Sequence, residues 1–386
     1  MSKCIILLNS PYLGGAERSI ILQSLHIPQE CLFIVPTLEG DNGRDVISFI
    51  NETKKDHNYK IESLCYPSAL YQVSRSGAIG RLFTLTYSFL LVFLELRRIH
   101  INAQDIIWIN GNKVGFPTLI YLTIKGFKGK MIWHFRDYPY DKGVFKIVWA
   151  LLRKNLSMKK VLVSNSNSVT SEVRRICNGS DNVFKTLYNP VGKIGAKKKS
   201  HNQIKRIGIV SMFAPWKGIH TILEFEKLYH KELKDLGIES IDIYGGDIYK
   251  TAGAHDDYLN QLKRLYKNGS LIKFRGRQSP SVIYSDIDLL IHPSIDKEPF
   301  GRIIAEAFSC GLPVISTGLG GSGELVLNKV TGLTYFPYDH SGLFQSLSTI
   351  VRNDKFRSEL IKNSSEHLVS IEKEQRELIQ QLVLKA

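Results

Sequence analysis

The chain has 386 residues, of which 43% are hydrophobic and 23% are charged. This length and composition exclude a largely disordered chain and are enough for two α/β domains, each with a core of its own. The net charge is +15 at pH 7, which leaves three classes of anionic partner: nucleic acid, a membrane surface and a phosphorylated substrate.

The positive charge is unevenly distributed along the chain. Residues 1–200 contain 28 Lys or Arg and 14 Asp or Glu, whereas residues 201–386 contain 23 and 22. The net charges of these two halves are therefore +14 and +1. This difference indicates that the N-terminal half meets something anionic.

The cysteines and the apolar segments indicate the cellular compartment in which the protein is expected. Five cysteines are scattered without metal-ligand spacing, which predicts reduced thiols and no zinc site. The apolar run near the N-terminus is too short for a signal peptide and predicts a first strand. The uncharged and mostly apolar segment at 82–94 has thirteen residues, fewer than the roughly 20 that a spanning helix needs. We therefore expect a cytoplasmic protein without a membrane-spanning helix.

Short β-branched segments alternate with longer helical ones, a pattern typical of parallel sheets built from βαβ units. In the first half we expect strands at 3–9, 31–36, 105–110, 130–134, 161–164 and 184–188, and helices near 15–25, 78–99, 115–125, 143–157 and 166–176. In the second half we expect strands at 206–212, 240–246, 271–276, 288–294, 313–317 and 332–336, and one or two closing helices at 355–383.

A segment rich in Pro, Gly and Lys interrupts this pattern at residues 189–205, which indicates a linker. We predict two Rossmann-like doubly wound domains, at 1–190 and 205–365, joined by a basic linker at 191–204. A closing helix at about 366–386 is expected to pack back on the first domain. Folds of this kind bind ligands at the carboxyl ends of their strands.

The first candidate site residues follow the first strand, in the segment NSPYLGGAERS. Gly14 and Gly15 allow a ligand to approach the backbone, and the helix that follows offers free N–H groups to a phosphate. A turn that needs glycine for its geometry alone explains the same pattern.

A lysine follows the first strand of the second half, in SMFAPWKGIH. Lys217 precedes a helical run and can neutralise the charge that builds on a departing diphosphate. The alternative is an ordinary lysine of a first helical turn, although a cation there opposes the helix dipole.

The most specific segment is HPSIDKEPFGRIIAEAFSCGLPVIST. We expect a helix to begin at Glu298-Pro299-Phe300-Gly301, which would bring Glu298 and Glu306, eight residues apart, to nearly the same face. Carboxylates suit the hydroxyls of sugars and ribose. Alternatively, Glu298 offsets the helix dipole and Glu306 pairs with Arg302.

Further candidates also follow strands. Gly320 and Gly321 precede a short predicted helix, and Gly245 follows a strand; each can offer backbone N–H groups to a phosphate. His134 ends a strand of the first domain and is either structural or directed at the ligand. Asp286 and Asp288 form a DxD motif, but Asp288 at the start of an apolar strand indicates a structural role rather than metal binding.

Taken in order, GGAER, KG, EPFGRIIAEA, GLPVIST and the later glycine pair resemble the retaining glycosyltransferases of family 4, or group 1, along almost the whole chain. The resemblance implies the GT-B fold, in which two Rossmann-like domains face each other across a cleft. It also implies metal-independent hexosyl transfer, with the acceptor on the N-terminal domain.

The resemblance assigns a role to each matching position. Glu298 contacts the donor sugar, Glu306 the ribose, and Lys217 the diphosphate, which Gly15 approaches from the other domain. His134 is the histidine beside the transferred sugar. Backbone N–H groups for sugar or phosphate come from Phe300, Gly301, Gly320 and Gly321.

One position departs from the family pattern. An Arg usually precedes the Lys, but Ser211 and Met212 stand here, and Met cannot replace a bidentate phosphate ligand. Arg275 or Arg277 could compensate. The departure also allows a catalytically weak subunit that binds a nucleotide sugar, and a sugar-nucleotide epimerase of the same fold ranks below both.

These observations predict a retaining glycosyltransferase that uses a UDP- or GDP-linked sugar, with no other cofactor and no metal. Two segments, 81–98 and 143–160, are both hydrophobic and basic, which suggests contact with an anionic membrane. We expect the first to form a buried helix and the second to form a helix in the membrane interface. We therefore expect a peripheral enzyme on the cytoplasmic face of the cell membrane. Its acceptor would be a lipid-linked glycan of a capsule or lipopolysaccharide, and its partners would not include nucleic acid.

Overall fold

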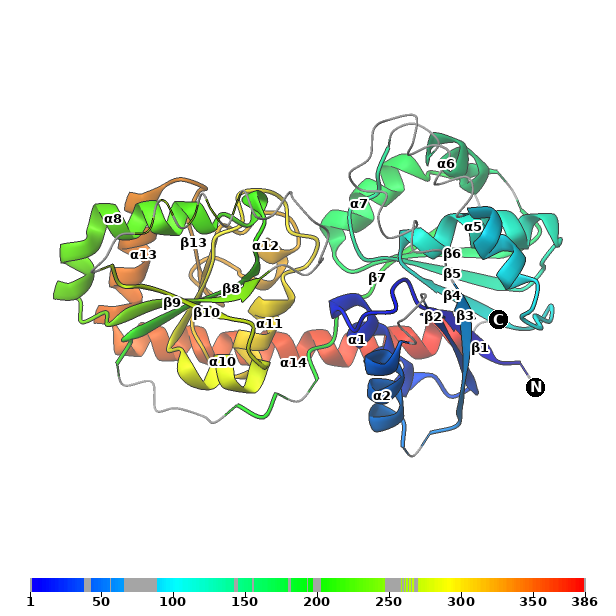
Figure 1. The fold of residues 1–386 in the computed structure, drawn as a ribbon, viewed down its shortest axis with the longest axis horizontal. Coiled ribbons are helices and arrows are strands. Elements are labelled where there is room, and N and C mark those ends of the chain that lie inside the picture. The colour runs from blue at the N-terminus through cyan, green and yellow to red at the C-terminus, as the bar shows by residue number, and fades with distance from the viewer. Residues whose placement is uncertain are drawn as a thin grey trace. The chain divides into compact units, whose positions relative to one another are not determined.

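A computed structural model of the chain describes residues 2–37, 43–55, 57–65, 89–141, 145–154, 156–179, 182–192, 194–196, 203–246 and 270–384, with alternate residues from 258 to 266. The chain divides into two compact units (Figure 1). Unit 1 comprises residues 1–190 and 372–386, and unit 2 comprises residues 191–371. The sequence prediction also placed a boundary after residue 190, and the acceptor and donor roles that it gave to the two parts stay predictions.

Unit 1 is built on a parallel sheet of seven strands in the order β3-β2-β1-β4-β5-β6-β7. Its strands are β1 (Cys4–Leu7), β2 (Cys31–Thr37), β3 (Tyr59–Cys65), β4 (Ile106–Asn110), β5 (Lys130–Phe135), β6 (Lys159–Ser164) and β7 (Asn182–Thr186). Its helices include α1 (Gly15–Gln23), η1 (Ser24–His26), α2 (Arg44–Thr53), α5 (Asn112–Ile124), α6 (Phe145–Arg153) and α7 (Asn167–Ile176), and residues 89–96 are also helical.

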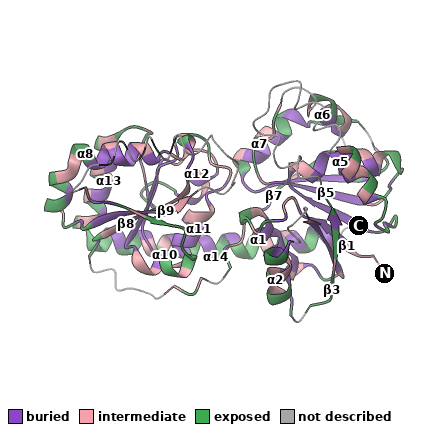
Figure 2. Ribbon diagram, viewed as in Figure 1, coloured by how far each residue is buried: buried purple, intermediate pink, exposed green. Residues whose placement is uncertain are grey.

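The sheet of unit 1 has an apolar cluster on each face, because successive side chains of a strand point to opposite faces. In β1, Ile5 and Leu7 belong to one cluster, whereas Cys4 and Ile6 belong to the other. Residues 89–96 and helices α5, α6 and α7 cover the first face. Helices α1 and α2 and the last turns of α14 (Asp354–Leu384) cover the second. Figure 2 shows inner strands such as β1 and β5 as buried, whereas the edge strand β3 is largely exposed.

Unit 2 repeats this plan with six parallel strands in the order β10-β9-β8-β11-β12-β13. The strands are β8 (Arg206–Met212), β9 (Ser240–Gly246), β10 (Ile272–Gly276), β11 (Leu289–His292), β12 (Val314–Ser316) and β13 (Leu333–Thr334). The helices include η2 (Pro215–Lys217), α8 (Ile219–Asp235), α10 (Pro280–Asp286), α11 (Arg302–Ser309), α12 (Ser322–Leu325) and α13 (His340–Arg352). Helices α8 and α13 pack on one face of the sheet, and α10 and α11 lie on the other (Figure 1).

Most predicted elements are present, and the differences have physical reasons. The pattern did not predict α2 and β3; β3 is an edge strand in which only Leu64 is buried, so its apolar signal is weak. The closing segment is one helix, α14, whose first part belongs to unit 2 and whose end belongs to unit 1. Of the predicted helix at 78–99, residues 78–88 lie outside the described residues.

The boundary between the units changes the distribution of charge. Unit 1 contains 27 Lys or Arg and 17 Asp or Glu, a net charge of +10. Unit 2 contains 24 and 19, a net charge of +5. The difference is smaller than between the two halves of the sequence, because the four lysines at 193 and 197–199 belong to unit 2.

Candidate functional site

The strongest cluster of unit 2 lies where β8 and β11 end. Lys217 follows β8 in η2, and Glu298 lies in the loop after β11. The Lys217 Nζ donates to Glu298 Oε2 over 2.5 Å, and each side chain is 12% exposed. The ammonium also lies 4.0 Å from the centre of the Trp216 ring. Two residues that are 81 positions apart therefore form one almost buried ion pair.

Two more side chains contact the same carboxylate oxygen. Ser294 Oγ lies 3.3 Å and His292 Nε2 lies 3.4 Å from Glu298 Oε2. Burial by itself raises the pKa of Glu298, but the hydrogen bond from His292 and the charge of Lys217 lower it to about 2. This carboxylate is therefore ionised at neutral pH, and it can accept hydrogen bonds from hydroxyl groups.

Backbone contacts hold the two loops in place. Glu298 N donates to Leu319 O over 3.0 Å, and Gly321 N donates to Glu298 O over 2.7 Å. Gly218, directly after Lys217, has φ +70, and a Cβ there would lie 2.0 Å from Pro293 O. Only glycine allows this close approach. The KG pair thus positions the lysine next to the loop that follows β11.

The prediction that a helix begins at Glu298 was wrong. Helix α11 begins at Arg302, and Gly301 precedes it with φ 91. Residues 298 and 320 form an isolated β-bridge instead. Glu298 and Glu306 therefore do not share a helix face, because the backbone of Glu298 is extended against the loop after β12.

Glu306 adopts the alternative that the sequence left open. Arg302 Nε donates to Glu306 Oε1 over 2.8 Å, and the Tyr284 hydroxyl donates to Oε2 over 2.8 Å. Both carboxylate oxygens thus have partners within unit 2, and the side chain is 11% exposed. The predicted contact with ribose stays a prediction.

The glycine candidates of unit 2 have different surroundings. The N–H of Gly321 already serves Glu298, so in this structure it holds the loop rather than facing a ligand. Gly320 lies on the other side of the same bridge, next to α12. Phe300 is buried, with 2% exposed. Gly245 lies in β9 with φ +138, where a Cβ would lie 1.7 Å from Ser211 O. Strand packing therefore accounts for this glycine.

The structure distinguishes the two arginines that could replace the missing one. Arg275 Nε donates to the buried Asp242 Oδ1 over 2.6 Å, so this guanidinium neutralises a carboxylate of the sheet. Arg277 is exposed and makes no ion pair with a described residue. A Cβ on Gly246 would lie 3.7 Å from Arg277 Cγ and Nε, and Gly246 pairs with Met212 in the sheet. Arg277 therefore lies beside the residue that pairs with Met212, the position of the missing arginine.

The DxD carboxylates are part of the scaffold. Asp288 Oδ2 accepts from the backbone N–H groups of Lys205 and Arg206, over 3.0 and 2.8 Å. Asp286 ends α10 and lies 3.5 Å from the Arg206 guanidinium. Among the described residues, no group of three or more His, Cys, Asp or Glu side chains is arranged to hold a metal ion.

In unit 1, Gly14 and Gly15 lie at the start of α1 as predicted, but a side chain covers this helix end. A Cβ on Gly14 would lie 3.1 Å from Glu17 Oε2. Glu17 is 3% exposed, and its Oε1 has no hydrogen-bond partner. Burial raises the pKa of Glu17 to about 7, although Arg136 and Lys113 oppose the shift. The helix terminus that the sequence offered to a phosphate thus faces a carboxyl group of its own first turn.

His134 lies in β5 and is fully buried, with its ring beside Trp108. Burial, and next the charge of Arg136, lower its pKa well below 6.5, although the backbone of Leu187 opposes the shift. Neither ring nitrogen has a hydrogen-bond partner with good geometry. The side chain is a neutral part of the core, which is the structural alternative that the sequence left open, and the contact with the transferred sugar stays a prediction.

Sequence reasoning missed the residue two positions further on. Arg136 follows β5 and donates through Nε to Asn110 Oδ1 and through Nη2 to Gln23 Oε1, over 2.7 and 2.9 Å. Its Nη1 donates to Asn189 Oδ1 over 2.5 Å. One guanidinium, directly after β5, thus joins the end of β4 and the segment after β7 to α1. The signal available was a charged residue directly behind a buried strand.

The prediction of an interfacial helix at 143–160 was wrong. The helical part, α6, ends at Arg153, and residues 159–160 begin β6. The apolar side of this helix, with Val148, Trp149 and Leu152, is buried in the core of unit 1 rather than free to face a membrane. Lys146 and Ile147 are the exposed side of α6. Among the described residues, no helix is both long enough and apolar enough to cross a bilayer.

Comparison with solved structures identifies the fold. The structure superimposes on HepE of Anabaena in complex with UDP and glucose, with a TM-score of 0.71, 19% identity, and coverage of 99% of this chain and 100% of the other. A glycosyltransferase from Rickettsia africae gives a TM-score of 0.70, 17% identity, and coverage of 100% and 99%. At these identities the likeness establishes the fold, which is GT-B, as predicted.

The sequence comparisons then give the family. Residues 193–367 match the model of the family described as "Glycosyl transferases group 1", and this part of the chain, nearly all of unit 2, belongs to that family. An uncharacterized glycosyltransferase of Methanocaldococcus jannaschii is 27% identical over 231 residues, which cover 56% of this chain and 60% of that protein. A capsular polysaccharide biosynthesis glycosyltransferase of Staphylococcus aureus is 21% identical over 62% of this chain and 61% of its own. The matches thus span about three fifths of these relatives.

Proposed function

We propose that this chain is a retaining glycosyltransferase of family 4 that transfers a sugar from a UDP- or GDP-linked donor to an acceptor hydroxyl. The observation that carries the proposal is the buried, ionised Glu298 beside Lys217 at the carboxyl ends of β8 and β11. Ligands of doubly wound sheets bind at this edge. The solved relative that contains UDP and glucose has the same fold, which supports the choice of donor.

Each member of the cluster has a task in this mechanism. An ammonium has three N–H donors, so Lys217 can keep its bond to Glu298 and still donate to a diphosphate. The ionised Glu298 would accept hydrogen bonds from hydroxyls of the donor sugar. As the bond between the sugar C1 and the diphosphate oxygen breaks, negative charge grows on that oxygen, and a fixed cation stabilises it. A fixed cation thus takes the place of a metal ion.

Retention requires that the new bond forms on the face from which the diphosphate departs. In the proposed step the acceptor oxygen bonds to C1, and its proton passes to the departing phosphate. The transition state resembles an oxocarbenium ion. Lys217 and His292 lower the pKa of Glu298. The carboxylate therefore stays ionised near the positive charge that develops on the sugar ring.

For the acceptor, we propose a lipid-linked glycan of a capsule or lipopolysaccharide, bound by unit 1 at the cytoplasmic face of the membrane. The net charge of +10 in unit 1 and the capsular relative support this part. Since the apolar side of α6 is in the core, attraction to the membrane would be electrostatic and would weaken with salt. Flotation with anionic and neutral liposomes tests it: no binding to anionic vesicles at low salt would refute membrane attachment.

The transfer itself is tested on Lys217→Ala with Lys297→Ala as a matched control. Lys297 is an exposed lysine next to Glu298. We expect Lys217→Ala to lower the rate of nucleoside diphosphate release by about 100-fold or more, the usual effect of losing one charge-stabilising donor. The control should retain the normal rate. The donor is first selected by thermal shift against UDP, GDP and their sugars, because a ligand of the folded state raises the unfolding temperature. Equal rates in both variants would refute the role of Lys217.

A nucleotide-sugar-binding subunit without turnover is a second candidate, and Met212 favours it because the usual arginine is missing there. Such a subunit would show the thermal shift with the donor but no release of nucleoside diphosphate. Release by the normal chain, lost in Lys217→Ala, excludes this candidate.

A further inference from the structure

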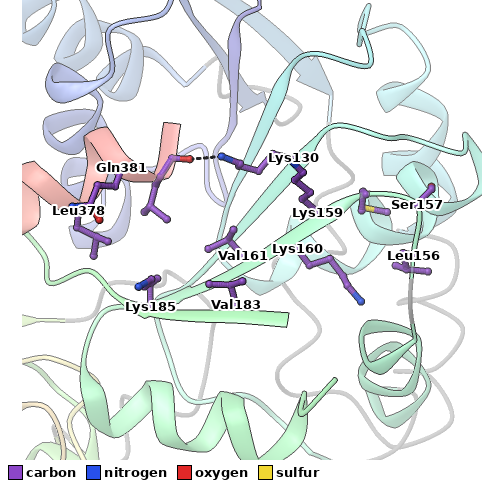
Figure 3. A pocket seen from close by; sticks show the side chains of 12 residues that line it. Lys130, Leu156, Ser157, Lys159, Lys160, Val161, Val183, Lys185, Leu378 and Gln381 are labelled. Atoms are coloured by element: carbon purple, nitrogen blue, oxygen red, sulfur yellow. Dashed lines mark hydrogen bonds between the residues drawn. The ribbon is translucent and has the colours of Figure 1, made fainter. Parts of the chain in front are cut away.

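Unit 1 has a cavity of about 530 Å³ at the amino ends of β5 and β6, beside the edge strand β7 (Figure 3). Lys130 and Lys159 are the first residues of their strands and line it. Leu378, Gln381 and Leu382, near the end of α14, lie on its other side (Figure 3). Candidate residues such as Arg136 follow the opposite, carboxyl ends of the strands. The cavity is therefore separate from the proposed transfer site.

Among the described residues that line this cavity, every charged one is a lysine. Its twelve lining residues include Lys130, Lys159, Lys160 and Lys185 and no Asp or Glu. Lys130 Nζ donates to Leu382 O over 2.9 Å, and Lys160 Nζ donates to Leu152 O over 2.8 Å. These two ammonium groups thus serve backbone carbonyls. Lys159 and Lys185 are exposed, and neither forms an ion pair with a described carboxylate.

Between these two lysines the lining is apolar. Val161 and Val183 are paired in the sheet, so their side chains lie next to each other on one face. Leu378 lies near them from the side of α14 (Figure 3). Val183 is 48% exposed although it belongs to a strand, which means that α14 leaves this part of the sheet uncovered. The apolar floor of the cavity, formed by Val161 and Val183, thus has a lysine at each end, Lys159 and Lys185.

We propose that this cavity binds a single anionic lipid, with its phosphate headgroup at Lys159, the first part of its alkyl chain on Val161 and Val183, and Lys185 adding positive charge at the other end of the valine pair. Pockets for small ligands commonly measure about 300–1,000 Å³, which includes the size of this cavity. None of the described residues that line the cavity is aromatic, so they offer no stacking partner to a nucleobase. Charge and apolar surface together select an amphiphile over either a free anion or a neutral lipid.

The proposal makes binding depend on both ends of the ligand. Calorimetry with hexyl, octyl and decyl phosphate below their micelle concentrations should show affinity rising by about fourfold for each methylene that enters the cavity. Inorganic phosphate and octyl glucoside should bind at least tenfold more weakly than octyl phosphate. Equal affinity for phosphate and octyl phosphate would overturn the proposal, because the apolar floor would then contribute nothing.

Variants locate the binding. Lys159→Glu/Lys185→Glu should weaken octyl phosphate at least tenfold, whereas Lys55→Glu/Lys128→Glu, an equal change of charge at two exposed lysines outside the cavity, should not. Val183→Thr should reduce the dependence on chain length but keep the preference for the anion. Thermal unfolding checks that each variant is folded.

Equal losses in both charge variants would show general attraction to a basic protein and would also overturn the proposal. Since the cavity lies outside the transfer site, Lys217→Ala should bind octyl phosphate normally, which separates this test from that of the proposed function.

Discussion

Two glutamates, one in each unit, lie beyond the carboxyl ends of the strands of similar sheets and have very different pKa values. Glu17 lies in the helix after β1 of unit 1, and Glu298 lies in the loop after β11 of unit 2. Both are largely buried, yet the pKa of Glu17 is raised to about 7 and that of Glu298 is lowered to about 2.

Partners make the difference. Glu298 has the ammonium of Lys217, with His292 and Ser294, around one oxygen. Glu17 has hydrogen bonds from backbone N–H groups and the charges of Arg136 and Lys113, but it has no ion pair, and its Oε1 has no hydrogen-bond partner among the described residues. Burial penalises the ionised form of both groups, and only the carboxylate in direct contact with a cation overcomes this penalty. The comparison teaches that burial alone does not identify a charged site, whereas a buried carboxylate with a direct cation partner does.

The largest expected effect comes from removing that partner. Lys217→Met should destabilise unit 2 by about 4 kcal/mol at pH 7, because it leaves a buried carboxylate without its cation. In the normal protein the low pKa of Glu298 contributes stability that is present above its unfolded value of 4.5 and is lost as the pH falls towards 2. Urea unfolding at pH 7 and pH 3 measures both. A variant as stable as the normal chain would mean that the ion pair does not hold the two loops.

Glu17→Gln should have the opposite sign. The raised pKa of Glu17 means that its favourable contribution is present below 4.5 and is lost as the pH rises through about 7. The neutral amide should therefore stabilise unit 1 by as much as about 3 kcal/mol at pH 8 and change little at pH 4. Glu52→Gln, at an exposed glutamate of α2, is the control. If Glu17→Gln changes the stability equally at the two pH values, folding does not raise the pKa of Glu17.

The smallest effect distinguishes the two arginines beside β10. Arg277→Ala should weaken binding of a nucleoside diphosphate about tenfold, the loss of one charge-assisted contact, and leave stability unchanged. Arg275→Ala should instead lower stability by about 1 kcal/mol, because the buried Asp242 loses a hydrogen-bond partner. Titration calorimetry and urea unfolding of both variants check this. The reverse pattern would assign the phosphate to Arg275.

The alternation of short β-branched segments with helical ones was enough to predict the α/β class and the positions of most strands. Strands β8 and β9 begin and end where the pattern placed them. The motif residues also predicted where ligand chemistry would concentrate in unit 2. By contrast, the segment at 143–160 was misassigned, because an amphipathic pattern does not say whether its apolar side meets a core or a membrane.

The sequence by itself determined the fold class, the family of its second part and the types of residue that end the strands, because periodicity, glycine spacing and motif order are local properties of the chain. Only the tertiary structure decided which groups share a site. It paired Glu298 with a lysine 81 residues away, started α11 after Glu298, buried His134 and left a basic cavity under the end of α14. The state of a charge depends on neighbours and burial, and folding brings these together from distant parts of the chain.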